Sequence, residues 1–383
     1  MAIQTGLQVL LAQRLNLLTG RRVGLVTNPT GVLPDLTLNV DALLAAGVRV
    51  TALFGPEHGL RASAPDGQAV ASGRDPRTNL PVHSLYGPIK KPTPDMCADV
   101  DVFVYDIQDV GARFYTYIWT LSYVMEAAAE LGKPVIVLDR PNPLGGLRME
   151  GGLLDERYSS FVGRWPIPWR HGLTPGELAR WFNQRTACDL TVVPLSGWQR
   201  YMWYDETGLP WVPPSPAMPT LNTAVVYPGT CLFEGTTMSE GRGTALPFEW
   251  IGAPWMDGEA WARHLNQLGL PGVRFRPVAF TPSASKHAGL ECYGVQVHVL
   301  DRDSFLPVRT GLHMLATARR LAPAHFTWLP SSWEGRPPHI DLLSGGPGVR
   351  EILSAGGSVA AIEATWPQGL AAFEAQRQAS LLY

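Results

Sequence analysis

Several residues that could do chemistry follow four short apolar runs in the first half of the chain. They are Asn28, Glu57, His58, Asp106, Gln108, Asp139, Arg140 and Asn142. If the four runs are parallel strands, their carboxyl ends open on one edge of the sheet, where open α/β sheets bind ligands. We therefore expect these side chains to converge on a single crevice. Each cluster alone gives weak support, because Asn, Asp and Pro are also common in turns.

Glu57 is the strongest candidate for an acid catalyst. It lies in the segment Gly55-Pro56-Glu57-His58-Gly59, where glycines let the backbone take an unusual path and approach a ligand closely. A carboxyl group that loses water in such a crevice has a raised pKa, which suits a general acid. The alternative is a loop carboxylate paired with an arginine. His58 could carry a proton, contact the ligand or only hydrogen-bond within the loop.

The arginines near these carboxylates have two possible roles. Arg113 follows Asp106 and Asp109 closely enough to pair with one of them. It could instead bind a substrate carboxylate as a two-pronged donor. Asp139 and Arg140 present the same choice, and an ion pair is the favoured interpretation there.

A second polar stretch, residues 233–244, contains Glu234, Glu240 and Arg242 among three glycines. It is too polar and too rich in glycine for a core element. It lacks the Walker pattern, and no Gly-x-Gly-x-x-Gly follows the first apolar run, so we expect no cofactor. His-Glu-x-x-His and Gly-x-Ser-x-Gly are also absent. A metal bound by Glu57, His58 and Asp106 is conceivable, but the spacing does not indicate one, and we expect none.

The apolar runs themselves predict the first part of the fold. They comprise residues 22–27, 48–54, 100–105, 135–138 and 190–193. Continuous runs rich in Val, Ile and Leu are typical of strands buried on both faces of a parallel sheet. Residues 39–46 and 117–131 between them favour helices. The alternation predicts an α/β fold with a Rossmann-like open parallel sheet.

The second part of the chain has a different pattern. The proline-rich residues 210–219 cannot form a helix or a central strand, so we expect a rigid crossing segment near a domain border. Residues 293–300 alternate apolar and polar side chains, as half-exposed and often antiparallel strands do. Val308, Leu312 and Leu315 then mark a helix. These features predict a smaller α+β domain.

Composition excludes several classes of protein. The chain has 383 residues, a net charge of −2, 45% hydrophobic and 17% charged residues, which excludes disorder and argues against nucleic acid as a partner. The four cysteines are widely spaced, so we expect buried free thiols. We expect no signal peptide and no membrane span, and hence a cytoplasmic protein. The 13 tryptophans indicate core packing or stacking platforms for sugar rings.

Six long motifs resemble those of the DUF1343 family of exo-β-N-acetylmuramidases. They are residues 23–31 (VGLVTNPTG), 53–60 (LFGPEHGL), 105–120 (YDIQDVGARFYTYIWT), 137–146 (VLDRPNPLGG), 211–220 (WVPPSPAMPT) and 226–243 (VYPGTCLFEGTTMSEGRG). The resemblance covers nearly the whole chain. It implies a Rossmann-like domain at residues 1–228, an α+β domain at 229–383, and an active site in the cleft between them. Ala217 departs from the family pattern, which usually has Asn, and we expect no secretion leader.

The resemblance also implies release of terminal β-linked N-acetylmuramic acid from peptidoglycan fragments, with Glu57 as the catalytic acid. Glycoside cleavage further needs a group that stabilises the oxocarbenium ion. Glu240 or Glu234 could act as base or nucleophile; alternatively the sugar's acetamido group attacks, oriented by Asp106 or His58. The residues that could bind the lactyl carboxylate are Arg113, Arg140 and Arg242. Tyr115, Tyr117 and Trp119 could form a stacking wall.

Two other functions remain as alternatives. One is a hydrolase or lyase acting on a related acidic amino sugar, and the other is a non-catalytic protein that binds muropeptides or sugars. The expected partner in each case is a small amino sugar or muropeptide. Both a monomer and a homodimer are compatible with the sequence.

Overall fold

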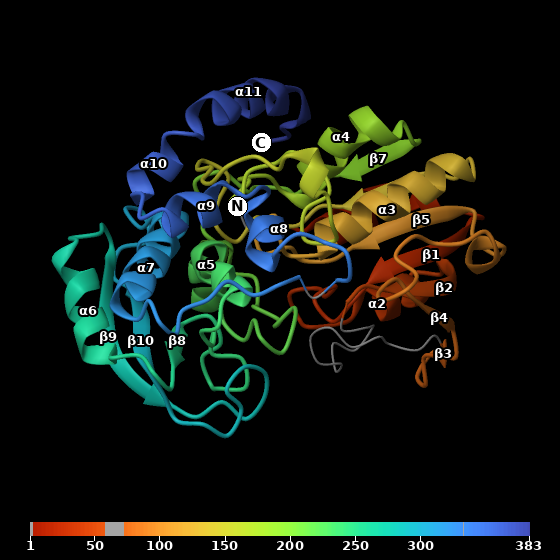
Figure 1. Cartoon of the computed structure of the whole chain (residues 1–383). Coiled ribbons are helices and arrows are strands. Elements are labelled where there is room, and N and C mark those ends of the chain that lie inside the picture. The colour runs from red at the N-terminus through yellow and green to blue at the C-terminus, as the bar shows by residue number, and fades with distance from the viewer. Residues whose placement is uncertain (1–2, 58–72, 332) are drawn as a thin grey trace.

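The computed structural model describes residues 3–57, 73–331 and 333–383, and it contains one large and one small β-sheet (Figure 1). The large sheet has seven strands in the order β3-β4-β2-β1-β5-β6-β7. Their bounds are β1 Arg22–Thr27, β2 Arg49–Gly55, β3 Gly73–Arg74, β4 Pro81–Ser84, β5 Val102–Asp106, β6 Val135–Leu138 and β7 Leu190–Val193. All neighbours pair in parallel except β3 and β4. The predicted parallel sheet is confirmed; β3 and β4 were not predicted.

Helices cover both faces of the large sheet, which explains why its central strands are mostly apolar. On one face Phe103 and Val137 pack with Leu121 of α3 (Tyr117–Glu130) and Phe182 of α4 (Pro175–Thr186). On the other face, the alternate strand residues pack against α1 (Gly6–Val9) and α2 (Asn39–Ala45). Alternation along a strand sends successive side chains to opposite faces. The helices predicted at 39–46 and 117–131 are α2 and α3.

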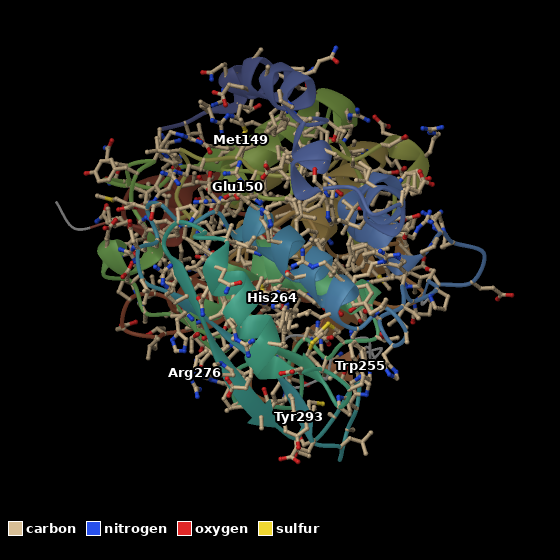
Figure 2. The ribbon with its side chains drawn as sticks, turned by 60° about the vertical axis from the view of Figure 1, so that its left-hand side comes forward. Met149, Glu150, Trp255, His264, Arg276 and Tyr293 are labelled. Carbon is tan, nitrogen blue, oxygen red and sulfur yellow. The ribbon has the colours of Figure 1, made fainter. Side chains whose placement is uncertain are left out.

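The small sheet is antiparallel, in the order β8-β10-β9. Its strands are β8 Trp250–Ala253, β9 Val273–Phe280 and β10 Cys292–Val299. Helix α6 (Gly258–Gln267) packs on β9 and β10, and Figure 2 shows His264 on this helix with Arg276 and Tyr293 on the strands. Val295 and Val297 are buried while Gln296 is half-buried, as the alternation at 293–300 predicted.

Helices α5 (Leu221–Thr230) and α7 (Pro307–Leu321) pack tightly against each other beside the small sheet. A Cβ atom on Gly229 would lie 1.9 Å from the Pro307 carbonyl oxygen, so only glycine fits at this crossing. The helix predicted around Val308 is α7. No regular helix or strand occurs at 210–219, in agreement with the proline pattern.

The remaining helices are short and lead the chain back to the large sheet (Figure 1). They are α8 His339–Ser344, α9 Gly348–Ser354, α10 Val359–Glu363 and α11 Pro367–Arg377. Single turns of other helix types occur at Leu10–Arg14, Leu15–Leu18, Asp95–Cys97, Glu156–Tyr158, Tyr204–Thr207, Cys231–Gly235 and Gln378–Ser380. The four cysteines are buried and free, as expected. Within the described part of the chain, no helix combines the length and apolarity that a membrane crossing needs.

Candidate active site

A cavity of about 710 Å³ is lined by residues from both parts of the chain. Residues before 228 contribute Glu57, Tyr86, Phe114, Tyr115, Thr116, Tyr117, Phe161, Val162, Ser215, Ala217, Met218 and Tyr227. Residues after 228 contribute Glu234, Glu240, Arg242, Phe248, Ser285, Lys286, Leu329, Pro330, Ser331, Trp333 and His339. A concave site of this size, with apolar walls and a few charged groups, suits a small-molecule ligand.

Glu57 lies two residues beyond the end of β2, so the sheet positions it at the cavity. Its Oε2 accepts a hydrogen bond of 2.8 Å from the hydroxyl of Thr116, the residue that precedes α3. The Tyr86 hydroxyl also contacts Glu57; burial, and then the Glu57 charge, raise the pKa of this tyrosine. Two hydroxyl groups from different segments therefore hold the carboxyl group in a fixed orientation.

Five charged or titratable side chains form what we call the charged wall: Glu234, Glu240, Arg242, Lys286 and His339. Arg242 Nη2 lies 2.6 Å from Glu234 Oε1, and its Nε lies 3.3 Å from Glu240 Oε1. Lys286 Nζ lies 2.7 Å from Glu240 Oε2. His339 Nε2 lies 3.7 Å from Glu234 Oε2. Each carboxylate thus has two basic neighbours, which compensates its negative charge away from bulk water.

Burial favours the neutral forms of Glu234 and Arg242 by shifting their pKa values in opposite directions. Burial is the main cause that raises the pKa of Glu234, and the nearby Glu240 charge adds to the effect. Burial lowers the pKa of Arg242 to about 10, which still leaves it cationic at neutral pH. Lys286 also donates to the carbonyls of Phe233 (2.7 Å) and Thr236 (3.0 Å), so it fixes the loop that carries Glu234 and Glu240.

The tyrosines expected to contact a sugar do line the cavity, but the neighbouring tryptophan does not. The rings of Tyr115 and Tyr117 lie 4.9 Å apart, and Tyr117 donates to the Pro214 carbonyl. Burial raises the pKa of both phenols. Trp119 is fully buried among core residues and donates to the Arg113 carbonyl at 2.7 Å. The prediction that Trp119 forms part of a stacking wall was therefore wrong.

Most of the polar residues at the carboxyl ends of the strands form a buried network outside the cavity lining. Arg140 Nε donates to Asp106 Oδ1 at 2.6 Å, and Asn39 donates to Asp106 Oδ2 at 2.7 Å. Asn28 Oδ1 accepts a hydrogen bond of 2.6 Å from the Thr30 hydroxyl, and Gln108 donates to the Pro141 carbonyl at 2.7 Å.

Of the polar groups expected in one crevice, Glu57 lines the cavity, whereas Asn28, Asp106, Gln108, Asp139, Arg140 and Asn142 do not. The physical reason is that Asp106, Asp139, Arg140 and Asn142 are hydrogen-bonded within the fold. The favoured ion pair also differs from the expectation, because Arg140 pairs with Asp106 rather than with its neighbour Asp139.

Arg113 is fully buried away from the cavity lining and contacts main-chain carbonyls. It donates to Gly152 (3.1 Å), Ile167 (3.0 Å) and, in α8 of the second part, Leu343 (2.7 Å). Burial lowers its pKa to about 9. Arg113 therefore joins the two parts of the chain, and the substrate role considered for it lacks structural support.

Asp139 and Asn142 also bind other parts of the fold. Asp139 accepts hydrogen bonds from Thr174 (2.7 Å), Gly176 (2.7 Å) and Tyr383 (2.6 Å), and burial raises its pKa to about 7. The Asn142 amide donates to the Leu173 carbonyl at 2.9 Å. Both side chains therefore hold the segment 173–176 against the end of β6, and Asp139 also holds the C-terminal residue.

Several cavity residues were not singled out from the sequence, among them Tyr86, Thr116, Lys286, Trp333 and His339. Thr116 had a usable signal, because it lies between Tyr115 and Tyr117 in a long motif. The others lie in segments without a chemical pattern. Ala217, the departure from the family pattern, is buried and lines the cavity.

His58 lies outside the described residues, so its candidate roles are untested. Among residues 3–57, 73–331 and 333–383, no three His, Cys, Asp or Glu side chains are arranged to hold a metal ion.

The chain matches two family models that together span most of its length. Residues 23–222 match "Exo-beta-N-acetylmuramidase NamZ, N-terminal", and residues 225–383 match "Exo-beta-N-acetylmuramidase NamZ, C-terminal". The peptidoglycan beta-N-acetylmuramidase NamZ of Bacillus subtilis (strain 168) is 48% identical over 384 residues, covering 100% of this chain and 91% of that protein.

Two solved structures of DUF1343 family proteins from Bacteroides fragilis have the same fold. One is 40% identical with a TM-score of 0.91, and the other is 32% identical with a TM-score of 0.80. Each comparison covers 100% of this chain and 99% of the other. The DUF1343 resemblance seen in the motifs is confirmed.

Proposed function

Because the chain belongs to the NamZ exo-β-N-acetylmuramidase family, we propose that it releases terminal β-linked N-acetylmuramic acid from peptidoglycan fragments. We place the reaction in the 710 Å³ cavity, where residues from the proposed domains 1–228 and 229–383 meet. The observation that carries the proposal is the presence of three carboxyl groups, Glu57, Glu234 and Glu240, together with Arg242 in one cavity.

Glu57 is the general acid in this proposal. Its carboxyl group is held by the Thr116 hydroxyl at 2.8 Å and faces the cavity from a turn after β2. Glycoside cleavage requires a protonated carboxyl group beside the leaving oxygen, since an alkoxide is a poor leaving group. A fixed orientation of the acid lowers the entropy cost of reaching the geometry in which the proton is transferred.

Glu240 is the second carboxylate, which attacks the anomeric carbon, takes a proton from the attacking water, or stabilises the oxocarbenium ion by its charge. It lies 3.3 Å from Arg242 and 2.7 Å from Lys286, so two cations hold its carboxyl group in place. Glu234, whose pKa is raised by burial, is the weaker candidate for this role. Two carboxyl groups in different protonation states are what acid-assisted glycoside cleavage needs.

Arg242 is the binding group for the lactyl carboxylate. It lines the cavity, and it presents a planar guanidinium with several N–H donors. Arg113 and Arg140 donate within buried networks instead. A substrate carboxylate bound to Arg242 would be repelled by the neighbouring Glu234 and Glu240. Its binding therefore requires the positive charge of Arg242.

The experiment compares two disaccharides with the wild-type protein. One is N-acetylmuramic acid β-linked to N-acetylglucosamine, and the other is the same disaccharide without the lactyl group. We expect release of N-acetylmuramic acid from the first and at least about a hundredfold lower kcat/KM with the second, because the second substrate has no carboxylate to bind Arg242. Tight binding of an intact first substrate would contradict catalysis. Equal cleavage of both would contradict the assigned substrate.

A further inference from the structure

Three aromatic side chains that line the cavity form what we call the aromatic rim: Tyr86, Phe161 and Trp333. The ring centroids of Tyr86 and Phe161 lie 5.7 Å apart. Trp333 comes from the second part of the chain, and nearby Arg336 donates to the carbonyl of Ser159, close to Phe161. This contact brings the two segments together at the cavity. The reaction proposed above assigns no role to the three rings.

The aromatic rim adjoins both Glu57 and Glu234. The Tyr86 hydroxyl contacts Glu57. The Trp333 ring lies 5.8 Å from the ring of His339, which in turn lies 3.7 Å from Glu234. The acid must lie beside the leaving oxygen, so the sugar that departs with this oxygen has to occupy the space next to Glu57 and Tyr86.

The rim and the charged wall differ sharply in charge. Glu234, Glu240, Arg242, Lys286 and His339 all belong to the charged wall. The rim residues themselves are uncharged, and so are the lining residues next to them in the sequence: Val162, Leu329, Pro330 and Ser331. Charged groups contact the rim at its edges, where Glu57 meets Tyr86 and Lys90 lies 4.8 Å from the centre of the Phe161 ring. A sugar that carries a carboxylate therefore matches the charged wall, and a neutral sugar matches the rim.

From this division we propose that the aromatic rim binds the neutral pyranose that leaves, with Trp333 as its main stacking platform. The inference rests on the proposed function and extends it to the second sugar of the substrate. Pyranose rings have an apolar face of C–H groups that packs on an aromatic face, while their hydroxyl groups stay hydrated at the edge. The cavity volume of about 710 Å³ lies in the range of sites for drug-sized ligands, which leaves room beyond one monosaccharide.

The test compares two substrates that share N-acetylmuramic acid but differ in the leaving group. One is the disaccharide with N-acetylglucosamine, and the other is the β-glycosyl fluoride, whose leaving group is too small to reach the rim. For Trp333→Ala we expect kcat/KM to fall about tenfold with the disaccharide and to change less than about twofold with the fluoride. Trp333→Phe, which keeps a ring, should retain most of the activity on the disaccharide.

Trp255 provides a matched control for this experiment. It is also half-buried and stacks on a histidine, with ring centroids of Trp255 and His325 5.7 Å apart, but it is not part of the cavity lining. Figure 2 labels Trp255. Trp255→Ala should leave both substrates unaffected.

The possible outcomes separate this proposal from the one on which it rests. An equal loss with both substrates would mean that Trp333 only supports the fold, and an undiminished rate with the disaccharide would also overturn the proposal. If the wild type releases N-acetylmuramic acid from neither substrate, the proposed function itself fails. If Trp333→Ala does not fold, Trp333→Phe and Trp333→Leu are compared instead: only the loss of the ring should impair the disaccharide reaction selectively.

Discussion

Removing one hydroxyl group, that of Tyr383, should destabilise the protein to an extent that depends on pH. This hydroxyl donates to buried Asp139 at 2.6 Å and accepts from the Leu195 N–H at 2.7 Å. Tyr383→Phe deletes both hydrogen bonds and leaves the ring against Trp198 in place, where the centroids lie 5.1 Å apart. The change therefore isolates the polar contacts.

The sign of the pH dependence follows from Asp139. Burial raises its pKa from 3.8 to about 7, so the folded protein holds a proton that the unfolded chain has released, and stability falls as pH rises from about 4 to 7. The Tyr383 hydroxyl counteracts this effect because it stabilises the ionised carboxylate. Its removal therefore raises the pKa of Asp139 further, and the loss of stability is largest above pH 7.

The magnitude follows from the charge of the acceptor. A hydrogen bond to a charged group contributes roughly 1.5–3 kcal/mol and one between neutral groups roughly 0.5–1.5 kcal/mol. With the additional loss at the Leu195 N–H, we expect Tyr383→Phe to cost about 3 kcal/mol at pH 8 and about 1–2 kcal/mol at pH 5.5.

Urea denaturation at both pH values measures this cost as a shift of the midpoint. Tyr201→Phe is the matched control, because Tyr201 is 62% exposed, and it should be neutral at both pH values. An equal penalty for Tyr383→Phe at the two pH values would refute the assignment of a titrating, tyrosine-bonded Asp139.

Three further predictions concern the cavity and its supports. Thr116→Val should lower kcat about tenfold with little change in KM, because Glu57 loses the 2.8 Å hydrogen bond that orients it; steady-state kinetics would show the split. Arg242→Ala should raise KM for muramic substrates about a hundredfold, and Arg242→Lys should restore part of the affinity; equal KM values would exclude a carboxylate contact. Arg113→Met should lower the free energy of unfolding by about 3–5 kcal/mol, since three buried carbonyls lose their donor, and chemical denaturation tests this.

The sequence predicted the large sheet well because local composition determines which strands are buried on both faces. Residues 22–27, 135–138 and 190–193 coincide with β1, β6 and β7. Strand β4 was not predicted because its four residues, Pro81–Ser84, include a proline and a histidine and so do not form an apolar run.

The roles of the polar residues were harder to predict because they depend on residues far away in the chain. Arg113 donates to Leu343, 230 residues away, and Asp139 binds Tyr383, 244 residues away. Neither contact leaves a local pattern. Residues 233–244 were predicted to be too polar for a core element, but Phe233 and Met238 are buried in the hydrophobic core. The pairing of Glu240 with Lys286 required the folded chain.

The most direct test of the account is the activity of Glu57→Gln on two substrates that differ in their need for an acid. The disaccharide of N-acetylmuramic acid and N-acetylglucosamine needs a proton on its leaving oxygen, whereas the β-glycosyl fluoride of N-acetylmuramic acid does not. We predict that Glu57→Gln loses at least about a hundredfold in kcat/KM with the disaccharide and less than about tenfold with the fluoride. A folded Glu57→Gln variant with wild-type activity on the disaccharide would contradict the role of Glu57 as general acid.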